Sequence, residues 1–363
     1  MFNFKELRHI HIELTSKCNA RCGNCPRNFY GGAKYEWLQE NEYTIERFKN
    51  DFPPHVLKQI NFLHFCGSYG DPAACNDLEE IIEYASSFEI DLQINTNISM
   101  RSKKSWKRIS CLLKKGSRIV LSIDGLEDTN HLYRRGTNWK KIEENILALE
   151  GTRADIIWEC LLFKHNVHQK ELIIKQGKEW KVDEVVFKNP LGFEVDNRGV
   201  SYMPMVDKEG RVEYILYPHE QNVSSVYNAK LKLELNILKD KVKSDYQPKE
   251  YRQNKSDETS NISCRSLDNK EIYIDARGVV YPCCFFGALD NPLQMDTQLL
   301  DYLHFKDMDT YSLTNRSLEE IMNSNFYSEV QNSWTCKSYS EGRLAICDKY
   351  CSKKKGDFHK IYK

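Results

Sequence analysis

Short apolar runs alternate with amphipathic stretches over the first half of the chain, and this alternation restricts the possible folds strongly. The strand-like runs are residues 9–14, 61–66, 91–95, 118–123, 156–163 and 183–187. When strands and helices follow one another in strict turn, the strands form a parallel sheet covered by helices. Six such units predict an α/β fold, a partial (β/α)6 barrel of the TIM type.

The stretches between these runs carry helix start and stop signals. One helix is expected after the capping-box pattern of Asn76 and Glu79. A second is expected over residues 102–115, because Gly116 follows it, and a third begins near Asn138.

The alternation fails after about Leu191, so the barrel is predicted to span residues 1–200. Residues 201–262 are polar and charged, and they predict a linker with one helix near residues 231–242 and a mobile stretch over residues 247–261.

Residues 263–363 predict a small C-terminal α+β domain that closes on the barrel mouth. The segment "KEIYIDARGVVYPCC" is typical of a hairpin that turns at Gly278. Ser317 and Glu320 form a capping box before a short helix.

Charge and cysteine content restrict the class of protein. Lys plus Arg and Asp plus Glu number 52 each, so no net field favours nucleic acid or a membrane surface. The first residues lack the apolar run of a signal peptide or membrane span, which predicts a cytoplasmic protein. Thirteen cysteines in that compartment point to metal binding or redox chemistry, because disulfides are rare there.

Three of the cysteines lie close together in "ELTSKCNARCGNCPRN", where Cys18, Cys22 and Cys25 have the spacing C-x3-C-x2-C. A structural zinc site takes four protein ligands, whereas a [4Fe-4S] cluster held by three cysteines keeps one iron open. The triplet therefore predicts a cluster with a vacant iron. A chance thiol group, or a zinc site completed by a distant residue, is the alternative.

This spacing resembles the signature of the radical S-adenosylmethionine (SAM) superfamily. The resemblance implies that the vacant iron binds the amino and carboxylate groups of SAM. It also implies that one electron cleaves SAM to a 5'-deoxyadenosyl radical, which abstracts hydrogen from a substrate C–H bond.

Later segments extend the resemblance to the SAM contacts. The family's Gly-Glu-Pro segment, which holds the methionine amino group, is similar to Gly70, Asp71 and Pro72. Asp in place of Glu shortens the reach, and an ordinary turn is the alternative. Thr96 and Asn97 in "INTNIS" would bond the ribose hydroxyls, or they would cap the strand end.

The fourth strand reads "VLSIDGLEDTNHLYRRG", in which Ser122 and Asp124 share one side by period two. The resemblance assigns Ser122 and Arg135 to the methionine carboxylate, with Arg134 as a competing neighbour. Surface salt bridges are the alternative for both arginines. Asn24 replaces the aromatic residue that the family usually has before its third cysteine, so the adenine contact is expected elsewhere, for instance at residues 163–166.

A second cysteine group lies near the C-terminus and resembles the SPASM extension, or its single-cluster form, twitch. The resemblance implies one auxiliary [4Fe-4S] cluster ligated by Cys264, Cys283, Cys347 and Cys351, with Cys284 and Cys336 as spares. A closed four-cysteine site fits electron transfer or a structural role, and a zinc site is the alternative.

Taken together, these features predict a radical SAM oxidoreductase or maturase. Its expected partners are a peptide or small-molecule substrate and an electron donor such as flavodoxin or ferredoxin. Because the chain begins almost at its first strand, no N-terminal peptide-recognition domain is expected. Cys66 at the second strand end is a candidate hydrogen donor, with core packing as the favoured alternative. His9, His11 and His64 are expected to be structural histidines.

Two other functions compete with this one. A non-catalytic interaction protein would bind zinc or iron-sulfur at both cysteine groups. An RNA-modifying radical enzyme would need a basic surface, for which "RSKKSWKR" at residues 101–108 is a candidate, although the solvated face of a helix explains this segment better.

Overall fold

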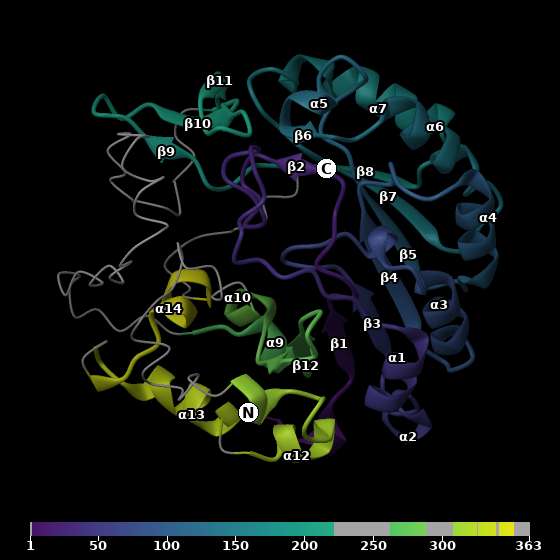
Figure 1. Cartoon of the computed structure of the whole chain (residues 1–363), viewed down its shortest axis with the longest axis vertical. Coiled ribbons are helices and arrows are strands. Elements are labelled where there is room, and N and C mark those ends of the chain that lie inside the picture. The colour runs from purple at the N-terminus through teal and green to yellow at the C-terminus, as the bar shows by residue number, and fades with distance from the viewer. Residues whose placement is uncertain (1, 221–261, 288–307, 325, 339–340, 352–363) are drawn as a thin grey trace.

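The computed structural model describes residues 2–220, 262–287, 308–324, 326–338 and 341–351. Six of its strands are parallel and adjacent in chain order, as the sequence predicts (Figure 1). They are β1 (His9–Ile12), β3 (Phe62–Phe65), β4 (Asp91–Thr96), β5 (Arg118–Ser122), β7 (Asp155–Leu161) and β8 (Glu184–Lys188). The predicted partial barrel is therefore confirmed.

The sheet continues beyond β1 into the C-terminal region. β12 (Glu271–Ile274) pairs parallel with β1, and β13 (Val280–Tyr281) pairs antiparallel with β12. The predicted hairpin thus exists, and Gly278 has the positive φ of 86° that its turn requires. Main-chain hydrogen bonds fix this hairpin to the barrel, giving the eight-stranded order β13-β12-β1-β3-β4-β5-β7-β8. The domain boundaries themselves stay a prediction.

Helices cover the outer face of the sheet (Figure 1). The main ones are α3 (Leu78–Ser86), α4 (Lys103–Leu112), α6 (Trp139–Leu147) and α7 (Lys170–Glu179), preceded by α1 (Ile45–Asp51) and α2 (Pro54–Leu57). The apolar strand positions that face them include Ile10, Leu63, Phe65, Leu92, Ile94, Ile119, Leu121 and Trp158, all fully or almost fully buried. Burial of this apolar face supplies the main driving force for the fold.

The predicted helix signals are confirmed at two of the three helices. Ser102 caps α4 and Asn138 caps α6 through their side chains, although α4 ends at Leu112, three residues earlier than expected. The capping box at Asn76 and Glu79 is wrong. Asp77 precedes α3 without a side-chain cap because its carboxylate accepts from the backbone amide of Ile45 instead.

The region after β8 contains strands that the sequence reading missed. β9 (Glu194–Val195), β10 (Ser201–Val206) and β11 (Val212–Leu216) form an antiparallel sheet, so the first part of the expected linker is a hairpin. Met203 and Met205 of β10 pack with Phe163 and Tyr133 in a second, smaller core. Pro204 within β10 conceals the strand pattern. The helix expected near residues 231–242 and the stretch 247–261 lie outside the described residues.

The remaining elements are short. Before the SPASM-like segment they are η1 (Phe4–Glu6), β2 (Arg21–Cys22), η2 (Pro72–Ala74), α5 (Asn130–Tyr133), β6 (Arg134–Arg135) and η3 (Val167–Gln169). The C-terminal ones are α9 (Arg265–Asp268), α10 (Cys284–Gly287), η4 (Met308–Tyr311), α12 (Leu318–Met322), α13 (Phe326–Asn332), η5 (Ser333–Thr335) and α14 (Ala345–Cys351). The capping box of Ser317 and Glu320 at α12 is confirmed. Within the described residues, no helix has the length and apolarity needed to cross a membrane.

Candidate functional site

The N-terminal cysteines lie on the loop that follows β1, at the carboxyl edge of the parallel strands. This edge is where α/β proteins place their ligands. Cys22 belongs to β2, which pairs antiparallel with β6 so that Cys22 lies opposite Arg134. The fourth strand and its following loop thereby hold the cysteine loop in place.

The three thiols are half-buried, and none of them is in a disulfide. Burial raises the pKa of Cys22 to about 12 and also raises the pKa of Cys18 and Cys25. The three are near enough to influence one another electrostatically, but among the described residues they do not form a group tight enough to hold a single metal ion. A four-iron cluster, in which each thiolate bonds a different iron, needs wider spacing than one zinc ion does.

Asp71 links two of the predicted SAM-binding segments. Its Oδ2 accepts from the Asn97 backbone amide at 2.7 Å, and its Oδ1 accepts from that of Ala73 at 2.9 Å. Burial raises the pKa of Asp71, while these amide donors oppose the rise. The carboxylate therefore ties the β3 loop to the end of β4.

The end of β4 reaches the first cysteine. Asn97 Nδ2 donates to Cys18 Sγ at 3.8 Å and to Asn19 Oδ1 at 2.9 Å. Thr96 Oγ1 accepts from the amide of Ile98, so the Thr96 hydroxyl also caps its own strand end. Asn97 thus lies beside the cysteine loop, whereas Thr96 is on the buried face of β4 and caps the local backbone.

A buried ion pair borders Cys22. Arg134 Nε lies 2.6 Å from Asp124 Oδ2, and Arg134 Nη1 donates to Cys22 Sγ at 3.7 Å. Burial raises the pKa of Asp124, and the nearby guanidinium counteracts it. For Arg134, burial works against its charge, but Asp124 and Cys22 outweigh this and raise its pKa. Arg134 is therefore a cation held against a thiol.

Arg135 points elsewhere. It donates to the Val206 carbonyl and to the Tyr214 hydroxyl, and its Nη2 lies 2.7 Å from Glu213 Oε2. Those partners belong to β10 and β11. Arg135 therefore fastens the antiparallel hairpin over the cysteine loop, whereas its neighbour faces the thiols.

Glu13 is a site residue that the sequence reading missed. It is 1% exposed, its Oε1 accepts from the amides of Tyr69 and Gly70 at 2.6 and 2.7 Å, and Tyr273 OH donates to its Oε2 at 3.3 Å. Burial raises its pKa to about 7. The sequence offered one indication of this role, because Glu13 is a carboxylate at the end of the first strand and lies five residues before Cys18.

Four cysteines of the C-terminal group lie together. Cys264, Cys283, Cys347 and Cys351 line one small apolar pocket together with the rings of Phe285, Phe286 and Trp334. A hydrogen bond with Cys351 lowers the pKa of the Cys264 thiol. The two spares, Cys284 and Cys336, do not line this pocket.

This segment matches a known family. Residues 264–352 match the sequence model of SPASM, described as an iron-sulfur cluster-binding domain. The C-terminal segment is a SPASM domain. The auxiliary cysteine pocket lies within it, so the predicted extension is confirmed.

Solved structures resemble the whole chain. SuiB of Streptococcus suis bound to precursor peptide SuiA matches with a TM-score of 0.51 and 12% identity, covering 94% of this chain and 76% of that one. BtrN in complex with AdoMet and 2-DOIA matches with a TM-score of 0.44 and 14% identity over 95% of this chain and 92% of that one. Native anSMEcpe with bound AdoMet matches with a TM-score of 0.49 and 15% identity, covering 92% of this chain and 88% of that one. The SuiB match shows that this chain shares the fold of that structure, a partial barrel followed by a C-terminal domain.

Proposed function

We propose that the protein is a radical SAM enzyme with one auxiliary cluster. Cys18, Cys22 and Cys25 would hold the first [4Fe-4S] cluster and leave one iron for SAM. When bound, the cluster and SAM supply a reducing electron and a 5'-deoxyadenosyl radical that abstracts hydrogen from a substrate C–H bond. The observation that carries this proposal is the meeting of the three thiols with the Asp71 and Arg134 networks at one sheet edge.

The donor set fits such a cluster. None of the three thiols is in a disulfide, and they are near enough to influence one another electrostatically, as ligands of one cluster must be. The Arg134 guanidinium offsets part of the negative charge that three thiolates would bring into a buried site.

The SAM contacts follow from the same networks. Because the Asp71 carboxylate already accepts two backbone amides, we assign the methionine amino group mainly to main-chain carbonyls near Gly70 and Pro72. Arg134 is the better-placed cation for the methionine carboxylate, and Ser122 remains the second candidate for this group. Thr96 and Asn97 remain the candidates for the ribose, and Asp124 orients Arg134.

The auxiliary cluster would bind Cys264, Cys283, Cys347 and Cys351. These four thiols line a pocket with apolar rings. Four cysteines would ligate all four irons of the cluster, so no iron would be left open for a substrate. We therefore assign this cluster to electron transfer, with flavodoxin or ferredoxin as the class of external donor.

The substrate would lie against the inner face of the sheet. By strand alternation this face carries polar, partly exposed side chains, whereas the outer face is apolar. They include His64, Gln93, Asn95, Ser122, Glu159 and Lys188, the last two forming an ion pair. This surface suits a polar peptide side chain or a small polar metabolite. Peptides are bound in the SuiB and anSMEcpe structures, and 2-DOIA is bound in BtrN.

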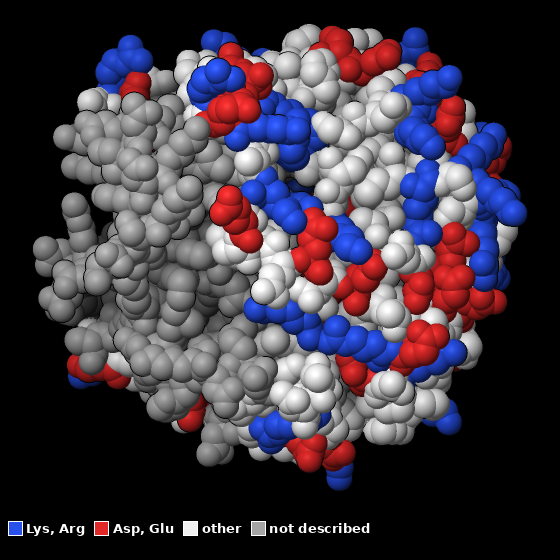
Figure 2. Space-filling model, viewed as in Figure 1, with Lys and Arg blue, Asp and Glu red and all other residues white. Residues whose placement is uncertain are grey.

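The basic segment at residues 101–108 gives the RNA-modifying alternative little support. Arg101 pairs with Glu79, and Arg108 lies within 4 Å of carboxylates of Glu79, Glu80 and Glu83. Figure 2 shows basic and acidic side chains interspersed over the helical surface. Carboxylates therefore offset the charge of both arginines of this segment, which weakens its attraction for a phosphate backbone.

Anaerobic reconstitution with iron and sulfide, followed by dithionite and SAM, tests the proposal. We expect about eight irons per chain, as two cubane clusters need, and release of 5'-deoxyadenosine. Cys22→Ala should abolish that release, whereas Cys111→Ser, which changes an exposed thiol, should retain it. Bound zinc without SAM cleavage would overturn the proposal in favour of the interaction protein.

A further inference from the structure

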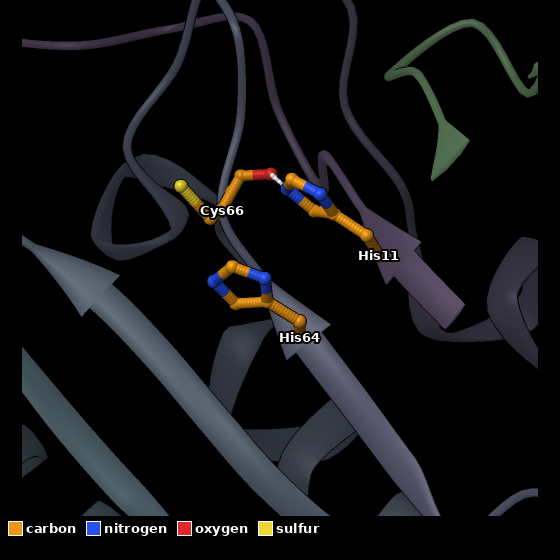
Figure 3. Close-up of side chains that lie close together, drawn as sticks. All are labelled: His11, His64 and Cys66. Carbon is orange, nitrogen blue, oxygen red and sulfur yellow. Dashed lines mark hydrogen bonds between the residues drawn. The ribbon is translucent and has the colours of Figure 1, made fainter. Parts of the chain in front are cut away.

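Three potential metal ligands meet on the inner face of the sheet, apart from both cysteine groups. His11 of β1 lies opposite His64 of β3 in the parallel register, and Cys66 follows two residues after His64 on the same face. One ligand atom from each residue lies within 4.8 Å of the others. Figure 3 shows the two imidazoles facing each other with the Cys66 side chain beside them.

We propose that His11, His64 and Cys66 bind one divalent metal ion of the zinc class. Two imidazoles and one thiolate are ligands that zinc prefers, and three protein ligands are typical of zinc sites with one open position. Around a tetrahedral zinc the ligand atoms would be about 3.5 Å apart. The side chains therefore need to close by about 1 Å, which rotation of the partly exposed His64 and Cys66 allows.

Hydrogen bonds already orient both imidazoles, as metal-binding histidines require. His11 Nε2 lies 2.8 Å from the Cys66 carbonyl oxygen. His64 Nε2 lies 3.0 Å from Asn95 Oδ1, an acceptor, and 3.1 Å from Gln93 Nε2, a donor. If Nε2 carries the proton in each ring, Nδ1 keeps a free lone pair. Asn95 Oδ1 also accepts from Gln93 Nε2 at 2.8 Å, which fixes the amide that holds His64.

Burial favours the neutral imidazoles, and ring stacking sets the positions from which His64 would rotate on metal binding. Burial lowers the pKa of His64 to about 4 and lowers that of His11 well below its usual value, which favours the neutral imidazoles. The rings of His11 and His64 stack at 4.3 Å, and the edge of Tyr273 closes the far side at 4.8 Å. The positive charge of Arg265 also lowers the pKa of both imidazoles. The negative charge of a metal-bound Cys66 thiolate would counteract this effect.

An ion at this site would present its open position to the inner face of the sheet. There it would hold a lone-pair donor of the substrate, such as an amine, hydroxyl or carbonyl group. A metal-bound Cys66 has no S–H bond, so this role replaces the hydrogen-donor role considered from the sequence.

Metal analysis of the iron-loaded protein tests the proposal, because loaded clusters withhold the other cysteines from zinc. After incubation with equimolar zinc and gel filtration, we expect one zinc and about eight irons per chain. Zinc-edge X-ray absorption of the wild type should show two nitrogen ligands and one sulfur ligand. Absence of zinc, or a four-sulfur signature, would overturn the proposal.

Variants locate the ion. His64→Ala and Cys66→Ser should lose at least nine-tenths of the zinc while keeping the iron, and iron content reports that each variant has folded. Cys111→Ser, the exposed-thiol control, should keep both metals. Zinc retained in iron-loaded His64→Ala and Cys66→Ser would contradict the site. None of these readouts depends on SAM cleavage, so failure here leaves the proposed function separately testable.

Discussion

Arg134 lies opposite Cys22 in the β2–β6 pairing, and its Nη1 donates to Cys22 Sγ at 3.7 Å while its Nε contacts Asp124. Hydrogen bonds and positive charge at cluster sulfurs raise the reduction potential, because they stabilise the more negative reduced state. The paired strands hold this cation at a fixed place.

Arg134→Met should lower the midpoint potential of the first cluster. Loss of a charge-assisted hydrogen bond is worth about 1.5 kcal/mol or more, which corresponds to about 60 mV for one electron. EPR-monitored redox titration measures the shift. Arg135→Met, which loses a contact to the β10–β11 hairpin instead, is expected to shift the potential less. Equal shifts would show that the two arginines act alike.

Glu13 should make stability depend on pH. Its folded-state pKa of about 7 exceeds the usual 4.5, so the folded protein binds its proton more tightly than the unfolded chain does. The stabilisation is complete below about pH 4.5 and is lost as pH rises through 7. Between pH 6 and 8 the loss is about 1.4 kcal/mol.

Glu13→Gln keeps the acceptor oxygen for Tyr69 and Gly70 without the ionisation. Urea unfolding at pH 6 and pH 8 gives the unfolding free energies of wild type and variant. Subtracting one from the other at each pH removes the contributions of the other carboxyl groups, which both proteins share. The variant should gain stability relative to the wild type at the higher pH. A difference that does not change with pH would show that Glu13 has an ordinary pKa.

Gly70→Ala should damage the β3 loop. A Cβ at Gly70 would overlap the Thr15 carbonyl, which is backbone and cannot move aside. We expect a loss of about 1–3 kcal/mol in unfolding free energy and weaker SAM binding by equilibrium dialysis. At Gly199 a Cβ meets nothing within 4 Å, although its φ of +82° strains any side chain, so Gly199→Ala should lose some stability but leave SAM binding unchanged. Normal SAM binding by Gly70→Ala would show that this loop does not contribute to the SAM site.

Cys347→Ser should lower the iron content of the reconstituted protein from about eight to about four per chain, because one auxiliary ligand is lost. Cys284→Ser should keep about eight, since Cys284 does not line the cysteine pocket. Iron analysis and Mössbauer spectroscopy measure both. The reverse result would exchange the roles of these two cysteines.

The sequence by itself determined the six parallel strands and the two cysteine groups. Strand alternation and C-x3-C-x2-C spacing involve residues that are close in sequence, so both patterns can be recognised without the tertiary structure. The same holds for the hairpin at Gly278, whose turn needs a residue that tolerates positive φ.

Tertiary structure alone decided which of two adjacent arginines faces the thiols, because neighbours in a strand point to opposite sides and pairing with β2 sets the side. It also brought Glu13 under Gly70 and stacked His11 on His64, since their contacts cross between strands far apart in sequence. The pairing of β12 with β1 was likewise hidden, because more than 250 residues separate strands that lie side by side.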